Sequence, residues 1–292
     1  MTLNITLAAR WLMAQSSDFR LTTDSGATVM SEVAQKQVVL QYHDWSGLVC
    51  YTGVARYGSH DTAAWLSQVL THEMGQRSPA QVVSKLCEEG TRWLRRVPAK
   101  YRHHTFTMIT FERGTPRVYV ISNFERPNGL RSEDAADALF CTSVRPRGPR
   151  CIVTGWSPAV VDSQRTELAD LLASAPSPHH LREAIALTSR DASARGQGTV
   201  GESCVVSHLC PDGSGQASVF GNLPAEFIPT MIVRGENVAT RFPDVTAQAG
   251  LSGPHRLVGA TWTANGETTM LLGVFRELSK QSGSGWPTDT SS

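Results

Sequence analysis

The sequence lacks an excess of charge of either sign. Its 292 residues include 27 Lys and Arg against 26 Asp and Glu, a formal net charge of +1. Non-specific affinity for nucleic acid comes from a surplus of basic residues that displace counterions, so this balance argues against a nucleic-acid partner. Two basic stretches, 92–104 and 145–150, are interpreted as solvated surfaces, because cations are common at helix ends and on exposed faces.

The sequence also lacks a long apolar run. No stretch approaches the roughly 18 to 20 apolar residues that a membrane-spanning helix needs. Residues 1–15 contain no basic segment ahead of their apolar run, and Arg10 interrupts that run, which is not typical of a signal peptide. We therefore expect a cytoplasmic protein without a membrane partner.

The sequence contains few cysteines, and they are not closely spaced. The six of them form no C-x-x-C pair, which predicts reduced thiols in a cytoplasmic chain of this length. Cys204, His208 and Cys210 could be interpreted as the ligands of a metal ion. They alternate on an apolar strand pattern and lack a fourth ligand at a suitable spacing, so core positions are favoured and no metal is predicted. The pairs at 103–104 and 179–180 are histidines without nearby ligand partners, and we interpret them as surface or packing residues.

The common catalytic and cofactor motifs are missing as well. The sequence has no G-x-S-x-G, S-x-x-K or H-E-x-x-H motif, no Walker loop and no dinucleotide-binding fingerprint. No cofactor is therefore predicted, and the search for a nucleophile turns to the beginning of the chain.

What the sequence does contain is a regular alternation of strand and helix patterns. Strands are predicted first, then two helices, more strands, two further helices and a final run of strands. The predicted helices cover 60–74, a segment from Ser78-Pro79 to about Leu94, 163–173 and 178–189; the predicted strands cover 4–11, 37–42, 47–54, 105–112, 117–122, 138–143, 151–154, 203–210, 216–220, 227–233, 255–263 and 268–275. This order predicts an α+β fold in which two stacked sheets are each covered by a helix pair. We expect a single domain over 1–278 and a flexible tail over 279–292, which is rich in Ser, Gly and Thr.

Position two is Thr2, directly after Met1. Removal of Met1 would place a hydroxyl and a free α-amine on one residue. An α-amine has an ordinary pKa of about 7.7 to 8.0, so part of it is neutral and can accept the hydroxyl proton. A threonine paired with its own terminal amine is an activated nucleophile.

Other residues extend this pattern. Asp18 and Arg20 follow Thr2 in an Asp-x-Arg segment, and Lys36 stands just before a predicted strand. The arrangement resembles the proteasome β-subunit family of N-terminal nucleophile hydrolases. In that family the threonine opens the first strand, an Asp-x-Arg follows at this separation, and a lysine precedes the next strand.

The resemblance continues downstream and covers roughly residues 2 to 210. Tyr51-Thr52-Gly53-Val54-Ala55 is similar to the family segment whose glycine N–H forms the oxyanion hole. Ser189-Arg190-Asp191-Ala192-Ser193, placed at the end of the second helix pair, resembles the segment whose Asp and Ser hold the terminal amine. The resemblance also offers Ser157 as a supporting serine, and it implies a four-layer αββα sandwich.

The resemblance implies a role for each of these residues. Thr2 would be the nucleophile and Gly53 part of the oxyanion hole. Lys36 would lower the pKa of the amine, Asp18 would hold Lys36, Arg20 would support the same loop, and Asp191 and Ser193 would hold the amine. The sequence departs from the family at several points. Lys36 stands later than an ungapped alignment would place it, Ser193 is not followed by Gly-Gly, and residues 211–276 exceed a minimal subunit.

The implied function is that of a proteasome-like threonine hydrolase that cleaves peptide bonds and works as a homo-oligomer, in a ring or a related assembly. Its partners would be a peptide or protein substrate and an ATPase or activator that the sequence does not identify. Two alternatives stay open: a small-molecule amidase on the same fold, and an inactive structural or interaction subunit.

Overall fold

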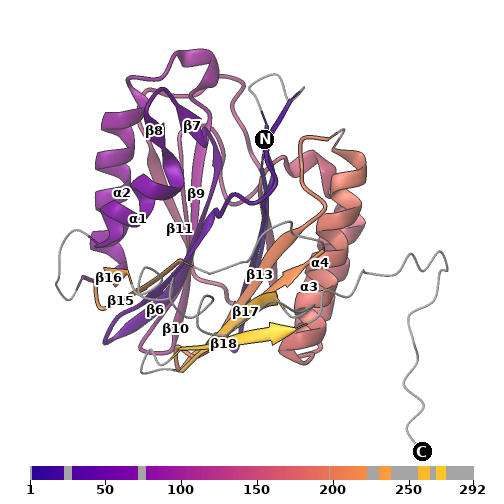
Figure 1. The fold of residues 1–292 in the computed structure, drawn as a ribbon. Helices are drawn as coiled ribbons and strands as arrows, with labels where there is room; N and C mark the ends of the chain where they lie inside the picture. The colour runs from indigo at the N-terminus through magenta and orange to yellow at the C-terminus, as the bar shows by residue number, and fades with distance from the viewer. Residues whose placement is uncertain are drawn as a thin grey trace, which may run out of the picture.

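The computed structural model describes residues 2–22, 28–71, 77–196, 198–221, 230–237, 256–263 and 268–273. Within these residues the chain forms two seven-stranded sheets that pack face to face, and each sheet has a helix pair on its outer side (Figure 1). The predicted α+β class is confirmed. The predicted tail over 279–292 lies outside the described residues.

In the first sheet, all neighbouring strands are antiparallel. In spatial order it comprises β12 (Arg150–Gly155), β1 (Leu3–Ala8), β2 (Met13–Asp18), β13 (Cys204–Leu209), β14 (Gly215–Phe220), β17 (Arg256–Trp262) and β18 (Thr268–Gly273). Strands β1 and β2 form a hairpin in which Ala8 pairs with Met13. The predicted first strand, 4–11, is therefore too long, because the chain already turns after Ala8.

In the second sheet, one pair of strands is parallel, β15 with β5. The order is β11 (Phe140–Val144), β10 (Thr115–Ser122), β9 (His104–Glu112), β6 (Trp45–Gly53), β5 (Gln37–Gln41), β15 (Thr230–Val233) and β16 (Glu236–Asn237). Two short ribbons lie outside the sheets: β3 (Leu21–Thr22) with β4 (Val29–Ser31), and β7 (Arg56–Tyr57) with β8 (His60–Asp61). The described strands after residue 211 thus extend both sheets.

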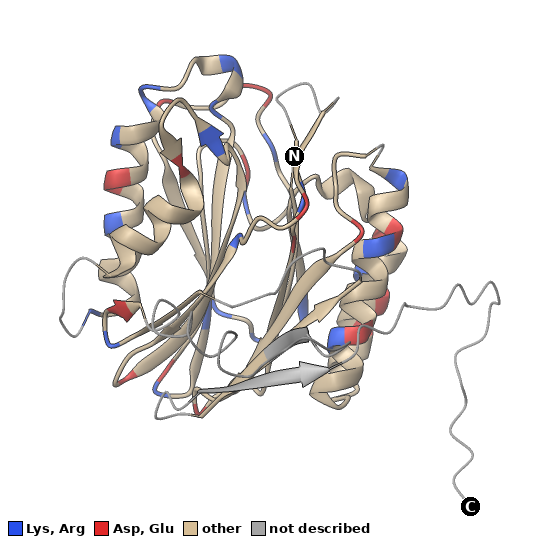
Figure 2. Ribbon diagram, in the orientation of Figure 1, with Lys and Arg blue, Asp and Glu red and all other residues tan. Residues whose placement is uncertain are grey.

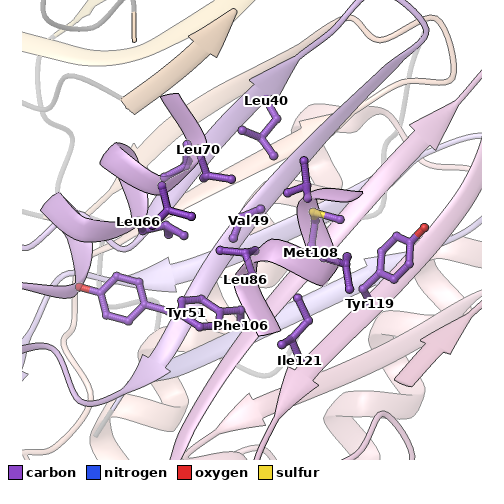
Figure 3. Packing of buried hydrophobic residues seen from close by; sticks show 14 of the residues in the cluster. Leu40, Val49, Tyr51, Leu66, Leu70, Leu86, Phe106, Met108, Tyr119 and Ile121 are labelled. Carbon is purple, nitrogen blue, oxygen red and sulfur yellow. The ribbon is translucent and has the colours of Figure 1, made fainter. Parts of the chain in front are cut away.

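Helices α1 (Thr62–Thr71) and α2 (Pro79–Leu94) pack on the second sheet. Helix α2 begins as predicted, because the Ser78 hydroxyl accepts the Gln81 N–H at 3.3 Å and the Gln81 side chain accepts the Ser78 N–H at 2.8 Å. Figure 3 shows the apolar layer that joins these helices to the sheet; it includes Leu40, Val49, Tyr51, Leu66, Leu70, Leu86, Phe106, Met108, Tyr119 and Ile121.

Helices α3 (Asp162–Ala173) and α4 (Pro178–Arg195) pack on the first sheet. The predicted end of α4 at Ser189 is wrong, because the segment 190–195 contains no helix breaker and the helix continues to Arg195, with Gly196 as its C-cap. Ser189, Ala192 and Ser193 then share the buried face of α4, at the i, i+3 and i+4 positions. Asp191 lies between them in sequence and falls on the exposed face.

A third apolar cluster fills the space between the two sheets, with Met13 and Val205 on one side and Leu48, Ile109 and Val118 on the other. Polar side chains also cross this layer. Gln15 donates to the Thr107 carbonyl at 3.1 Å, and Gln37 donates to the Gln15 carbonyl at 3.1 Å. These hydrogen bonds link one sheet to the other beside Thr6 of β1, with which Gln15 pairs.

Candidate active site

The start of β1 is held by hydrogen bonds from the end of β12 on one side and to Asp18 of β2 on the other. Thr2 is buried, and its carbonyl accepts the Trp156 N–H at 2.9 Å, just beyond the end of β12. Gly155 has φ +81°, and a Cβ atom there would lie 2.0 Å from the Thr2 carbonyl oxygen. Only glycine therefore permits this close approach. On the other side, the Leu3 N–H donates to Oδ1 of Asp18 at 3.1 Å.

Asp18 is the centre of a buried polar cluster next to this strand end. Its Oδ2 accepts hydrogen bonds from the Arg20 N–H at 3.0 Å, the Gly201 N–H at 3.1 Å and Nζ of Lys36 at 3.2 Å. Lys36 also donates to the Arg20 carbonyl at 2.5 Å. The structure thus brings together Asp18, Lys36 and the Thr2–Leu3 strand end, three parts of the sequence-predicted site.

Burial shapes the chemistry of Lys36. The side chain is fully buried, and desolvation lowers the pKa of its ammonium below the ordinary range, although the negative charge of Asp18 acts in the opposite direction. A lysine with a lowered pKa releases its proton more readily than a solvated one. In the folded chain this amine donates to Oδ2 of Asp18 and to the Arg20 carbonyl.

Arg20 lies at the edge of the same cluster and reaches across to the segment that follows α4. Its Nη1 donates to the carbonyls of Gly198 at 3.0 Å and Val200 at 3.2 Å, and its Nε pairs with Glu32 at 2.8 Å. Ser193 donates its hydroxyl to the same Val200 carbonyl at 2.8 Å. Arg20 and Ser193 thus both hold the segment whose Gly201 N–H binds Asp18.

A cavity of about 620 Å³ opens at this strand end. Thr2, Gly53 and Gly155 line it together with the ends of other elements of both sheets. Gly53 has φ +102°, and a Cβ atom there would lie 2.1 Å from the His103 carbonyl oxygen, so this position also requires glycine. The volume lies within the range of about 300 to 1,000 Å³ that is usual for small-ligand sites.

Asp191 does not take part in this arrangement. Its carboxylate lies on the exposed face of α4, accepts a hydrogen bond from Nε2 of Gln164 at 3.2 Å, and is not among the residues that line the cavity. Ser157, by contrast, is buried at the start of the 3₁₀ helix η2 (Ser157–Ala159), one residue after Trp156. Its hydroxyl accepts a hydrogen bond from Nη1 of Arg131 at 3.4 Å.

Glu125, a buried carboxylate behind the cavity wall, is not among the residues predicted from the sequence. Both of its oxygens accept the Gly155 N–H, at 3.2 and 3.3 Å, and Nε of Arg131 lies 3.9 Å away. Burial raises the pKa of this carboxyl, while the Thr105 hydroxyl, the Gly155 N–H and Arg131 partly offset that effect. Glu125 thereby fixes the turn that holds the Thr2 carbonyl. The only signal in the sequence is a polar Ser-Asn-Phe-Glu segment directly after a buried strand.

The parts of the chain that the structure describes hold no group of three or more His, Cys, Asp or Glu side chains suited to a metal ion. Cys204 and His208 lie on β13, where burial raises the pKa of the Cys204 thiol to about 12. His208 contacts Arg182, with 2.5 Å between Nδ1 and Nη1. In the same described residues, no helix is both long and apolar enough to cross a membrane.

Comparison with solved structures finds a similar fold in Anbu (ancestral beta-subunit) from Yersinia bercovieri. The TM-score is 0.51 at 13% sequence identity, over 71% of this chain and 82% of that chain. No protein-family model and no curated protein matches the sequence. The structural likeness indicates a proteasome-related fold; at this identity it says nothing of activity.

Proposed function

We propose that this chain is a proteasome-like N-terminal threonine hydrolase that cleaves peptide bonds once Met1 is removed. The observation that carries the proposal is the position of Thr2. It lines a cavity together with Gly53, while the Asp18 and Lys36 cluster is buried directly beside the same strand end. A nucleophile, an oxyanion donor and a charged group are thereby close to one another, as amide hydrolysis requires.

The proposed mechanism assigns each step to a residue. The Thr2 hydroxyl attacks the amide carbonyl, and its own α-amine accepts the hydroxyl proton and passes it to the leaving amine. An ester to Thr2 remains, and water hydrolyses it to release the acid and regenerate the hydroxyl. The Gly53 N–H would bind the oxyanion, and one such donor typically contributes a factor of about 10² to 10³ in rate.

The surrounding residues have supporting roles in this proposal. Lys36 keeps the α-amine neutral through its positive charge, and Asp18 holds both Lys36 and the start of β1. Arg20 and Ser193 position the 198–200 segment against Asp18. The contact between Asp191 and the terminal amine stays a prediction; Asp191 is exposed on α4 and its carboxylate accepts a hydrogen bond from Gln164.

We further propose that the chain is one domain with the four-layer αββα sandwich of the N-terminal nucleophile hydrolases, and that it works as a cytoplasmic homo-oligomer. The arrangement of two sheets between two helix pairs supports the first part. The structural neighbour is described as a β-subunit, which supports the second part. Native mass spectrometry of the purified chain tests the assembly, and a strictly monomeric mass at micromolar concentration would contradict it.

The experiment that tests the activity combines intact mass with covalent labelling. The chain is expected to begin at Thr2 and to gain one adduct from a peptide epoxyketone, which reacts with the hydroxyl and the amine of an N-terminal threonine. Thr2→Ser retains both groups and should label, whereas Thr2→Ala is trimmed in the same way but lacks the hydroxyl. If correctly processed wild-type protein gains no adduct, the inactive-subunit alternative is favoured.

A further inference from the structure

The charged side chains that line the cavity all have the same sign. Among the described residues, Arg20, Arg56, Lys100 and Arg131 contribute to the lining, and His103 adds an imidazole, but no Asp or Glu does. A formal net charge of +1 for the whole chain makes this local concentration of cations unusual. In Figure 2, several Lys and Arg residues (blue) lie at the end of the molecule where the N-terminus lies, and others lie on the outer helices and at the opposite end.

Carboxylates support three of these cations from outside the lining. Arg20 pairs with Glu32 at 2.8 Å, Arg56 with Asp61 at 2.8 Å, and Arg131 lies 3.9 Å from Glu125. Two of the carboxylates are engaged elsewhere: Asp61 accepts the Ala64 N–H in the first turn of α1, and Glu125 accepts the Gly155 N–H. The arginines are therefore oriented by groups that do not themselves enter the cavity.

Aromatic rings supply the apolar part of the same wall. Tyr57, Tyr101 and Phe124 line the cavity; the Arg131 guanidinium lies 5.1 Å from the centre of the Phe124 ring, and Nζ of Lys100 lies 4.5 Å from that of Tyr101. Such contacts restrain the charged ends of these basic side chains at the wall, where Nη1 of Arg131 also donates to the Ser157 hydroxyl. Cations held in this way bind a carboxylate with little loss of side-chain entropy.

From this lining we infer that the cavity binds a substrate carboxylate close to the amide that is cleaved. The inference rests on the proposed function, because it places the acidic group beside Thr2. An Asp or Glu side chain next to the scissile bond and the carboxylate at the end of a peptide share this chemistry. In both cases the anion replaces its water shell by guanidinium and ammonium donors.

The test uses correctly processed protein and four peptide epoxyketones that differ only in the residue next to the reactive group: Glu, Gln, Leu or Lys. We expect the second-order labelling rate to be about tenfold or more higher for Glu than for Gln, because one charge-assisted contact is worth about that factor, and lowest for Lys. The preference for Glu should shrink as salt is raised, since the cavity is open to solvent. Equal rates for Glu and Gln, or a preference for Leu, would overturn the inference while labelling itself upholds the proposed function. Failure of all four probes would overturn both.

Substitution of the cavity cations tests whether they cause the preference for Glu. Arg56→Gln and Lys100→Gln are each expected to lower the Glu rate severalfold more than the Gln rate. Arg92→Gln is the matched control, because Arg92 is an exposed arginine paired with Glu88 and Glu89 on α2 and does not line the cavity. A Glu preference that survives in the triple variant Arg56→Gln/Lys100→Gln/Arg131→Gln would overturn the inference.

The source of the carboxylate is decided by competition. A Leu-containing peptide with a free carboxyl end and its amide form are compared as competitors of labelling, alongside a Glu-containing peptide amide. Stronger competition by the free acid than by its amide assigns the site to a chain end, and stronger competition by the Glu peptide assigns it to a side chain. No competition by either carboxylate at millimolar concentration would contradict the inference.

Discussion

Nζ of Lys36 lies 3.2 Å from Oδ2 of Asp18, and both side chains are almost completely shielded from solvent. The other carboxylate oxygen of Asp18 accepts the Leu3 N–H. One carboxylate thus joins a buried ammonium to the residue that follows Thr2. Because a buried ion pair costs much desolvation energy, it stabilises the fold only while both partners and their hydrogen bonds are present.

Asp18→Asn should therefore be strongly destabilising. The variant leaves the Lys36 ammonium buried without its counterion, and such a loss costs about 3 to 5 kcal/mol of unfolding free energy. Urea denaturation followed by circular dichroism measures the change. The double variant Asp18→Asn/Lys36→Met removes both charges and should recover part of the loss. If Asp18→Asn alone unfolds at the wild-type urea concentration, the pair has no structural role.

Gly155→Ala should disturb the start of β1. A methyl group at this position would lie 2.0 Å from the Thr2 carbonyl oxygen, and the backbone has φ +81°, so strain of about 1 to 3 kcal/mol is added to the clash. We expect lower stability and a large loss of Thr2 labelling.

Gly129→Ala is the matched control for this variant. Gly129 has a similar φ of +83°, but no atom of the described residues lies within 4 Å of the added methyl group. It should show the backbone strain alone, about 1 kcal/mol, with normal labelling. Equal labelling rates in the two variants would mean that the approach of Gly155 to Thr2 is unimportant.

Glu125 should act on Thr2 through Gly155 rather than directly. Glu125→Ala leaves the buried Gly155 N–H without its acceptor, which costs about 1 to 3 kcal/mol and should slow labelling of Thr2. Glu125→Gln keeps an acceptor oxygen and is expected to restore both properties. Equilibrium unfolding and labelling rates are measured on the two variants together. If both label at the wild-type rate, Glu125 does not position the nucleophile.

Stability should fall in mild acid because of His104. This ring is fully buried among Tyr51, Trp93 and Phe106, and burial lowers its pKa from 6.5 to about 3. Between those values the unfolded chain binds a proton that the folded chain does not, so stability is lost as the pH falls below 6.5. This one residue should cost about 2 kcal/mol between pH 7 and pH 5.

His104→Phe is expected to remove that part of the pH dependence, because neither ring nitrogen has a hydrogen-bond partner among the described residues and a phenyl ring suits the surrounding aromatic residues. Urea unfolding at several pH values gives the slope for each variant. His179→Phe supplies the control, since the His179 ring is 69% exposed and pairs with Glu183 on the surface of α4, where solvent screens the interaction. A wild-type slope in His104→Phe would show that His104 is not the responsible group.

Much of the fold and part of the site could be predicted from local patterns. The strand and helix periods predicted the elements, and the spacing of Thr2, Asp18 and Lys36 predicted a common location that the structure shows for the Asp18 and Lys36 pair and the Thr2–Leu3 strand end. The predicted helix ended at Ser189, so the sequence-based prediction did not assign Asp191 to either face of α4. Once the helix continues to Arg195, Asp191 falls on the exposed face and Ser193 on the buried one.

The sequence by itself determined the alternation of elements, the balance of charge and the presence of a threonine able to become the first residue. These follow from side-chain periodicity and composition, which are local properties. The tertiary structure alone decided that Glu125 supports the Gly155 turn, and that Arg20, Arg56, Lys100 and Arg131 surround one cavity. These residues come from separate segments, and no local pattern contains the distances that sheet pairing and packing create between them.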